Sequence, residues 1–210
     1  MKIEIFSDFA CPFCYVGKRR LEQAIHELGM EEQVELEFKA YQLNPNADRV
    51  ESKPLINEKQ LATAEKLEAI EAHAAEVGLT YDMEKVLVGN TENAHRLAKW
   101  AKTFGRDAVF IEETMHRYFT KGLNVNSIEQ LLAIVAHVEL PVAEARAVLE
   151  DGNAYQEELA ADRYDIQQIP VTSVPFFVFE NRYGIKGAEP LRIFKETLLQ
   201  TADYLQKRAK

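Results

Sequence analysis

Two cysteines, Cys11 and Cys14, are the residues of this chain best suited to chemistry. They are its only cysteines, three positions apart in the motif Cys11-Pro12-Phe13-Cys14, where a strand pattern gives way to a helix pattern. A cysteine at a helix N-terminus faces free backbone N–H groups and the positive end of the helix dipole, which favours the thiolate. A cysteine one turn later lies on the same face, close enough to form a disulfide. The spacing predicts a redox-active dithiol in which Cys11 attacks and Cys14 resolves.

Two other interpretations of the motif are weaker. A zinc site needs two further ligands, but no other cysteine is present, and the five histidines (26, 73, 95, 116 and 137) are scattered without a pair at ligand spacing. Two incidental buried cysteines would not need a place at a helix start with a proline between them. No metal site is therefore expected, and a redox dithiol is favoured.

The residues around the cysteines set their reactivity. Pro12 suits the first helical position, which leaves the N–H groups of Phe13 and Cys14 to face the Cys11 sulfur. Phe13 has no donor or charge, so we expect less acidification than a histidine there would give. The basic run Lys18-Arg19-Arg20 is either a solvated helix face or a source of positive potential near Cys11.

The two ends of the chain have the patterns of one α/β domain. Alternating residues predict a strand over 2–7, apolar spacing predicts a helix from Pro12 to about 28, and a second strand follows over 34–40. This βαβ unit predicts two parallel strands with a right-handed crossover. Aromatic and β-branched residues near the other end predict strands over 174–180 and 183–186, with a last helix over 189–207.

The middle of the chain reads as helices alone. Glycine stops and polar caps delimit them, and the predicted ranges are 58–77, 92–104, 107–121, 127–138, 141–150 and 154–168. The flanking pieces are each too small to fold alone. We therefore expect one sheet domain formed by residues 1–55 and 169–210, interrupted by an all-α insertion over 56–168.

The motifs resemble those of a known family. The order strand, CPxC helix, strand, helical insertion, then Val-Pro before a hairpin and last helix resembles the DsbA-type thioredoxin fold, and more closely the FrnE-like cytoplasmic branch of DsbA-family oxidoreductases and isomerases. Relatives include 2-hydroxychromene-2-carboxylate isomerase and the kappa-class glutathione transferases. The resemblance covers essentially the whole chain, in the matching stretches Ser7–Arg19, Tyr41–Pro45, Asn90–Arg96, Val174–Val178 and Gly187–Pro190.

The resemblance implies roles that the residues alone leave open. The sequence cannot show the isomer of the Val174–Pro175 bond, and cis X–Pro bonds are a minority. In the family this proline is cis and lies against the CxxC motif, where it helps to hold the substrate chain. Asn90 and His95 are either a helix cap with a partly buried histidine or part of the groove where a substrate or glutathione docks.

Composition limits the partners. The chain has 210 residues, 47% of them hydrophobic, and a net charge of −9 without a basic cluster, which argues against a nucleic-acid partner. The longest apolar run, Leu131–Ala136, is too short to span a membrane, and the N-terminus shows no secretory signal. We therefore expect a cytoplasmic protein, as a monomer or homodimer.

These observations predict a thiol–disulfide oxidoreductase or isomerase. Cys11 is the nucleophile, Cys14 the resolving cysteine and Pro175 the residue that orients substrate, with Pro12, Phe13, Val174, Asn90 and His95 predicted to bind it. The substrate is a protein or small-molecule disulfide, and the recycling partner is unknown. No cofactor is expected, although glutathione is possible as a co-substrate.

Two alternatives remain open. The isomerase and transferase relatives typically carry a serine and lack the second cysteine, so a glutathione-dependent isomerase or transferase of a small aromatic compound is disfavoured here. The other alternative is a non-catalytic peptide-binding chaperone module.

Overall fold

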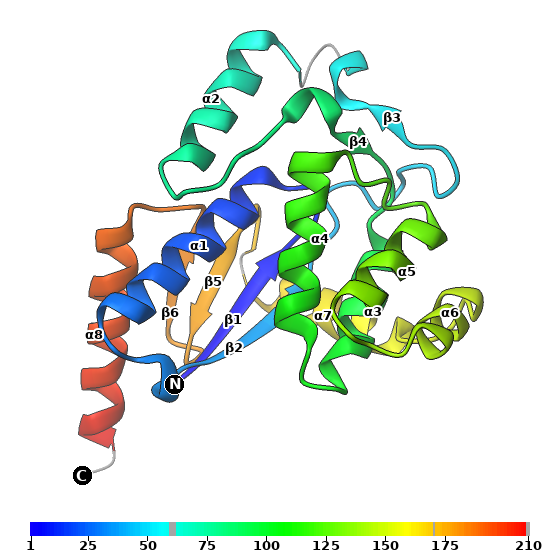
Figure 1. Cartoon of the computed structure of the whole chain (residues 1–210). Coiled ribbons are helices and arrows are strands. Elements are labelled where there is room, and N and C mark those ends of the chain that lie inside the picture. The colour runs from blue at the N-terminus through cyan, green and yellow to red at the C-terminus, as the bar shows by residue number, and fades with distance from the viewer. Residues whose placement is uncertain (59–61, 170, 209–210) are drawn as a thin grey trace.

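The computed structural model of the chain describes residues 1–58, 62–169 and 171–208. Within them, a four-stranded sheet has the order β2-β1-β5-β6 and consists of β1 (Lys2–Ser7), β2 (Glu35–Ala40), β5 (Phe176–Phe179) and β6 (Tyr183–Lys186). β1 pairs parallel with β2 and antiparallel with β5. Segments from both ends of the chain therefore share one sheet, as Figure 1 shows, and the predicted α/β thioredoxin-like fold is confirmed.

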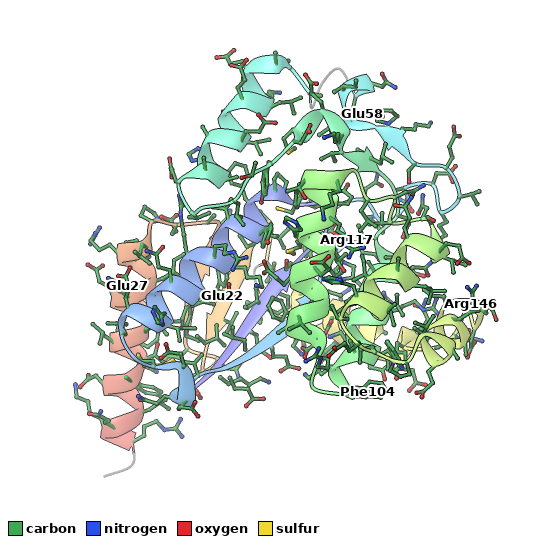
Figure 2. The ribbon with its side chains drawn as sticks, in the orientation of Figure 1. Glu22, Glu27, Glu58, Phe104, Arg117 and Arg146 are labelled. Atoms are coloured by element: carbon green, nitrogen blue, oxygen red, sulfur yellow. The ribbon has the colours of Figure 1, made fainter. Side chains whose placement is uncertain are left out.

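Side-chain alternation separates the two faces of this sheet. Ile5 of β1 pairs with Phe177 of β5 on the face that α1 (Pro12–Glu27) and α8 (Leu191–Arg208) cover. Phe6, one position later, lies on the opposite face in a smaller apolar cluster. Each large side chain that is fully buried here contributes roughly 1.5–3 kcal/mol to folding. At its C-terminal end α1 is also tied to α8, because Glu27, labelled in Figure 2, forms an ion pair with Lys195.

The insertion consists mainly of helices, as predicted. They are α2 (Ala64–Ala75), α3 (Glu92–Lys102), α4 (Asp107–Lys121), α5 (Ile128–His137), α6 (Val142–Glu150) and α7 (Gln156–Gln168). The predicted helix over 58–77 begins only at Ala64, because Thr63 caps it by accepting a hydrogen bond from the Lys66 amide. Residues 59–61 of that prediction lie outside the described part of the chain.

One small sheet was not predicted. β3 (Lys53–Pro54) and β4 (Leu87–Val88) pair antiparallel. Two residues per strand are too few to show an alternating pattern, so the sequence carried no signal for them. This pair and α2 lie at the end of the main sheet where α1 begins (Figure 1).

The insertion and the sheet domain share a continuous core. Cys14 and Tyr15 of α1 belong to the same apolar cluster as Tyr81, Leu97 and Phe119 of the insertion. The predicted boundaries at 56 and 168 stay a prediction. In the folded structure, both cysteines of the motif pack against residues of the insertion. None of the helices that the structure describes is long and apolar enough to cross a membrane.

Candidate active site

The cysteine motif lies where β1 passes into α1. A turn over 8–10 connects them, closed by the Cys11 amide, which donates to the Asp8 carbonyl oxygen at 3.1 Å. Cys11 is the N-cap residue and Pro12 occupies the first turn, as predicted. The Cys14 amide was predicted to face the Cys11 sulfur, but it donates to the Cys11 carbonyl oxygen at 3.0 Å. This detail of the prediction was wrong, because the first turn closes with an i to i+3 bond.

The two cysteines are free thiols with different surroundings. Cys14 is fully buried, whereas Cys11 is 5% exposed. Burial, followed by the neighbouring Cys11 thiol, raises the pKa of the Cys14 thiol well above its ordinary value, although hydrogen bonds from the Ser7 side chain and the Asp8 backbone oppose this. The geometry thus favours Cys11 as the attacking sulfur and Cys14 as a thiol that keeps its proton until a disulfide forms beside it.

The Val174–Pro175 loop lies against Cys11. The Val174–Pro175 peptide bond is cis, as the family resemblance implied. The Cys11 thiol donates to the Val174 carbonyl oxygen at an Sγ–O distance of 3.6 Å, across 163 positions of sequence. On the other side, the Gly187 amide donates to the Pro175 carbonyl oxygen at 2.7 Å, which ties the loop to the residue after β6.

Gly17 allows this close approach. It is one turn beyond Cys14 on α1, and a Cβ built on it would lie 3.0 Å from both the Pro175 ring and the Phe177 ring. A side chain there would force the loop and helix apart. Local sequence patterns do not single out this glycine, because the partner that requires it lies at the other end of the chain.

The insertion supports the start of α1 from the other side. The Tyr81 hydroxyl donates to the Pro12 carbonyl oxygen at 2.8 Å. Burial raises the pKa of Tyr81 well above its ordinary value, so this hydroxyl stays protonated as a donor. The Phe13 ring is 37% exposed and meets the His73 ring of α2 edge-on, with centroids 5.8 Å apart.

An apolar cavity of about 290 Å³ opens beside the motif. It extends from Ala10 and Pro12 to Ile70 of α2 and to Tyr118 of α4, and its wall is mostly carbon. Leu43, at its rim, is exposed. The cavity can receive an apolar side chain or ring of a substrate whose sulfur reaches Cys11.

Two predicted site residues are buried in polar contacts. The Asn90 amide group donates to the carbonyl oxygens of Pro45 and Ala47, both at 3.1 Å, and its Oδ1 accepts from the Glu92 amide at 3.0 Å. Asn90, one position before the N-cap residue Thr91, therefore satisfies the first backbone N–H of α3 and holds the loop after β2. Its predicted role in substrate binding stays a prediction.

His95 is 5% exposed and faces Asp8. Asp8 is a site residue that the sequence analysis did not predict. Its Nε2 lies 3.3 Å from Asp8 Oδ1, and its ring packs on Phe9 with centroids 4.8 Å apart. Asp8 Oδ2 accepts from the Leu43 amide at 2.7 Å. An acidic residue in an apolar run next to the motif was the one available signal for Asp8. The predicted place of His95 in the substrate groove stays a prediction.

The basic run after the motif begins with a buried lysine, so Lys18 does not lie on a solvated helix face. The predicted positive potential near Cys11 stays a prediction. Lys18 is only 3% exposed and pairs with Glu22 and Glu112, and Arg19 also reaches Glu112. Although burial works against it, the charges of Lys18 and Arg19 hold the pKa of Glu112 below its ordinary value. These cations serve to fix α1 against α4. In the described residues, no group of three His, Cys, Asp or Glu side chains could hold a metal ion.

A strand, a CxxC motif at a helix start and a proline loop touching the first cysteine define a thioredoxin-fold dithiol protein. The family model for the DsbA-like thioredoxin domain matches residues 2–199. The chain belongs to this family of disulfide oxidoreductases and isomerases, as its motifs predicted.

Solved structures agree with this assignment. A crystal structure of a probable DsbA oxidoreductase from Streptomyces coelicolor is 34% identical, with a TM-score of 0.90 over 97% of this chain and 90% of that one. A 2-hydroxychromene-2-carboxylate isomerase shares the fold at 14% identity, with a TM-score of 0.72 and full coverage of both chains. The cytosolic disulfide reductase DsbM from Pseudomonas aeruginosa, solved with GSH, is 18% identical, with a TM-score of 0.66 over 95% of this chain and 100% of that one. The two structures that are 14% and 18% identical show that the fold is shared.

Proposed function

We propose that this protein is a thiol–disulfide oxidoreductase or isomerase that acts on protein or small-molecule disulfides. The observation that carries the proposal is the asymmetry of the cysteine pair. Cys11 lies at the helix N-terminus against Val174, while Cys14 is fully buried one turn behind it. A dithiol of this form can attack a disulfide and then resolve the mixed disulfide.

The reaction has two exchange steps. The Cys11 thiolate attacks one substrate sulfur, the Cys11–substrate bond forms, and the other substrate sulfur leaves with the electron pair of the broken bond. Cys14 then attacks the Cys11 sulfur, which forms the Cys11–Cys14 disulfide and releases the second substrate thiolate. The substrate gains two electrons and the enzyme loses two. An external thiol must then reduce the enzyme, and glutathione is our candidate for that co-substrate.

The surroundings of the motif support a substrate with an apolar group next to its sulfur. The exposed Phe13 ring, the Val174 carbonyl and the apolar cavity beside Pro12 offer contacts on three sides of Cys11. Pro175 fixes the loop that carries Val174.

We propose that the protein acts in the cytoplasm, where such an enzyme would reduce or isomerise stray disulfides. The similarity to DsbM, a cytosolic disulfide reductase, supports this location.

Trapping the intermediate tests the proposal. A Cys14→Ala variant cannot resolve, so it should accumulate a mixed disulfide with oxidised glutathione or a disulfide peptide, visible by mass spectrometry of the intact protein. A Cys11→Ala variant should form no adduct and should lose insulin reduction. A Cys11→Ala variant that reduced insulin at the wild-type rate would refute the proposal.

A glutathione-dependent isomerase is the second candidate, because 2-hydroxychromene-2-carboxylate isomerase shares the fold over its full length. This function does not need a resolving cysteine. Isomerisation of an aromatic substrate by Cys14→Ala at the wild-type rate, together with no insulin reduction by the wild type, would favour it.

A further inference from the structure

Behind the cysteine pair lies a line of buried polar groups that the two exchange steps do not use. Ser7 is 6% exposed, and its side chain hydrogen-bonds Cys14, the sulfur that must lose a proton to resolve the mixed disulfide. Cys14 itself has no exposed surface. Its proton therefore cannot pass directly to solvent and needs an acceptor within the protein.

A small, partly open cavity, the inner cavity, has both Ser7 and His95 in its wall. The cavity has a volume of about 20 Å³. This is room for about one water molecule, since a site of ~10–15 Å³ can hold one when polar groups surround it. A single water there can accept a hydrogen bond from one residue and donate to the other.

His95 also lines a second, larger cavity, the outer cavity. That cavity has a volume of about 120 Å³, with Arg163 and Tyr41 in its wall. His95 thus contributes to the wall of the cavity that Ser7 lines and to that of a larger one.

Asp8 fixes the form of the imidazole. Its carboxylate Oδ1 has no hydrogen to give, so the 3.3 Å contact with His95 Nε2 requires the ring proton on that nitrogen. Nδ1 is then the free acceptor. The Asp8 contact thereby sets which ring nitrogen can accept a hydrogen bond.

We propose that Ser7 and His95 conduct the Cys14 proton away during resolution, with Asp8 as the residue that positions and stabilises the imidazole. The inference rests on the proposed function. As Cys14 Sγ bonds to Cys11 Sγ, the Cys11–substrate bond breaks and its electron pair leaves with the substrate sulfur. The Cys14 proton passes through the Ser7 hydroxyl and one water to His95. Ser7 touches the reacting sulfur, whereas His95 and Asp8 act through it.

Other charged groups face this route and bear on its pH dependence. Lys39 of β2, Lys99 and Lys102 of α3, and Asp107 of α4 line the inner cavity with His95. Arg163 of α7 and Tyr41 face it across the outer one. Tyr118 of α4 lies near Asp8, which helps burial to raise the pKa of that tyrosine. Among the groups named here, His95 is the imidazole that lines both cavities.

A two-phase reaction with an aromatic disulfide tests the proposal. The reduced full-length protein is mixed with 5,5′-dithiobis(2-nitrobenzoate) in a stopped-flow instrument. The first thionitrobenzoate release reports attack by Cys11, and the second reports resolution by Cys14. A Cys14→Ala variant must lose the second phase, which assigns it. Ser7→Ala and His95→Gln should lower the ratio of the second-phase rate to the first-phase rate by about 100-fold, the low end for positioned proton transfer.

Two further readouts separate proton transfer from a structural role. In the wild type, the second phase should show a solvent deuterium isotope effect and a pH inflection that both disappear in His95→Gln. The matched control is His137→Gln, because His137 is exposed on α5. A second phase at the wild-type rate in both Ser7→Ala and His95→Gln would overturn the inference alone. Failure of the wild type to release any thionitrobenzoate would instead overturn the proposed function.

Discussion

At the scale of single residues, the site depends on close approach between positions far apart in sequence. Gly17 lets α1 pack onto the Pro175 and Phe177 rings, and Phe177 is fully buried in the core of the sheet domain. Neither ring can move easily, because one is held in a loop bonded at Gly187 and the other is enclosed on all sides. Because Gly17 has no Cβ, the loop can approach α1 closely enough for the Val174 carbonyl to contact Cys11.

Gly17→Ala should lower both stability and activity. Overpacking typically costs about 1–3 kcal/mol, and the better helix propensity of alanine returns about 1 kcal/mol. We expect a free energy of unfolding about 1 kcal/mol lower, measured by urea denaturation, and a slower first exchange step.

Gly152→Ala is the matched control for this substitution. A Cβ at Gly152 would meet no atom within 4 Å, so its effect should stay within about 0.5 kcal/mol. Equal effects of the two substitutions on stability and on the first exchange step would contradict the packing role of Gly17.

At the scale of elements, α1 is held by ion pairs on the side away from the sheet. Glu112 of α4 accepts from Tyr15, Lys18 and Arg19, three residues within the first two turns after Cys14. Arg20 extends the attachment to Glu76 beyond α2 and to the carbonyl of Ala188. The helix that carries both cysteines thus has fixed partners in the insertion and near the last helix.

Glu112→Gln should weaken this attachment. It leaves the buried Lys18 with only the Glu22 contact, and we expect a loss of about 2 kcal/mol in the free energy of unfolding. This is less than the ~3–5 kcal/mol of a fully buried pair, because the carboxylate is partly exposed.

Glu113→Gln, one position later on α4, removes only contacts to Arg117 on the same helix and to the exposed His137. It should cost about 0.5 kcal/mol or less. Thermal or urea unfolding compares the two variants, and an equal loss in both would contradict the role of Glu112.

The elements were largely predictable from sequence, and their contacts were not. Alternation identified the strands at both ends, and glycine stops and caps identified the helices, because these signals are local. Tyr81 against Pro12 and His95 against Asp8 had no local signal, since each pair joins segments far apart. The resemblance supplied Val174 and Pro175, but the burial of Lys18 depended on a glutamate of α4 that only the fold brings near.

At the scale of the whole molecule, charged side chains connect the sheet to the insertion. Glu37 of β2 contacts Lys2 of β1 and Lys102 of α3. Burial acts against it, but hydrogen bonds from Lys2 and Lys102 lower the pKa of Glu37 to about 2. A carboxyl group whose pKa is lower when folded adds stability above its ordinary pKa and loses it as the pH falls toward the folded value.

Glu37→Gln should therefore matter at neutral pH and less in acid. We expect the wild type to exceed the variant by about 1 kcal/mol in free energy of unfolding at neutral pH, a modest value because solvent screens the pairs. The difference should shrink as the pH falls from about 4.3, the ordinary glutamate value, toward about 2. Urea unfolding at several pH values measures it. Glu35→Gln, at an exposed position of the same strand, is the control, and a difference that grew in acid would refute the assignment.

The place of β1 in the sheet has a consequence for synthesis on the ribosome. β1 receives its partner β2 by residue 40, but its other edge waits for β5, which begins at residue 176. At ~5–20 residues per second, those 136 residues (176 − 40) take roughly 7–27 s. During that time Cys11 lacks the Val174 carbonyl, and one edge of β1 is open to other strands. Cys11 is therefore synthesised well before the rest of its site is complete, and the insertion helices that are made in between are the first part of the protein able to cover it.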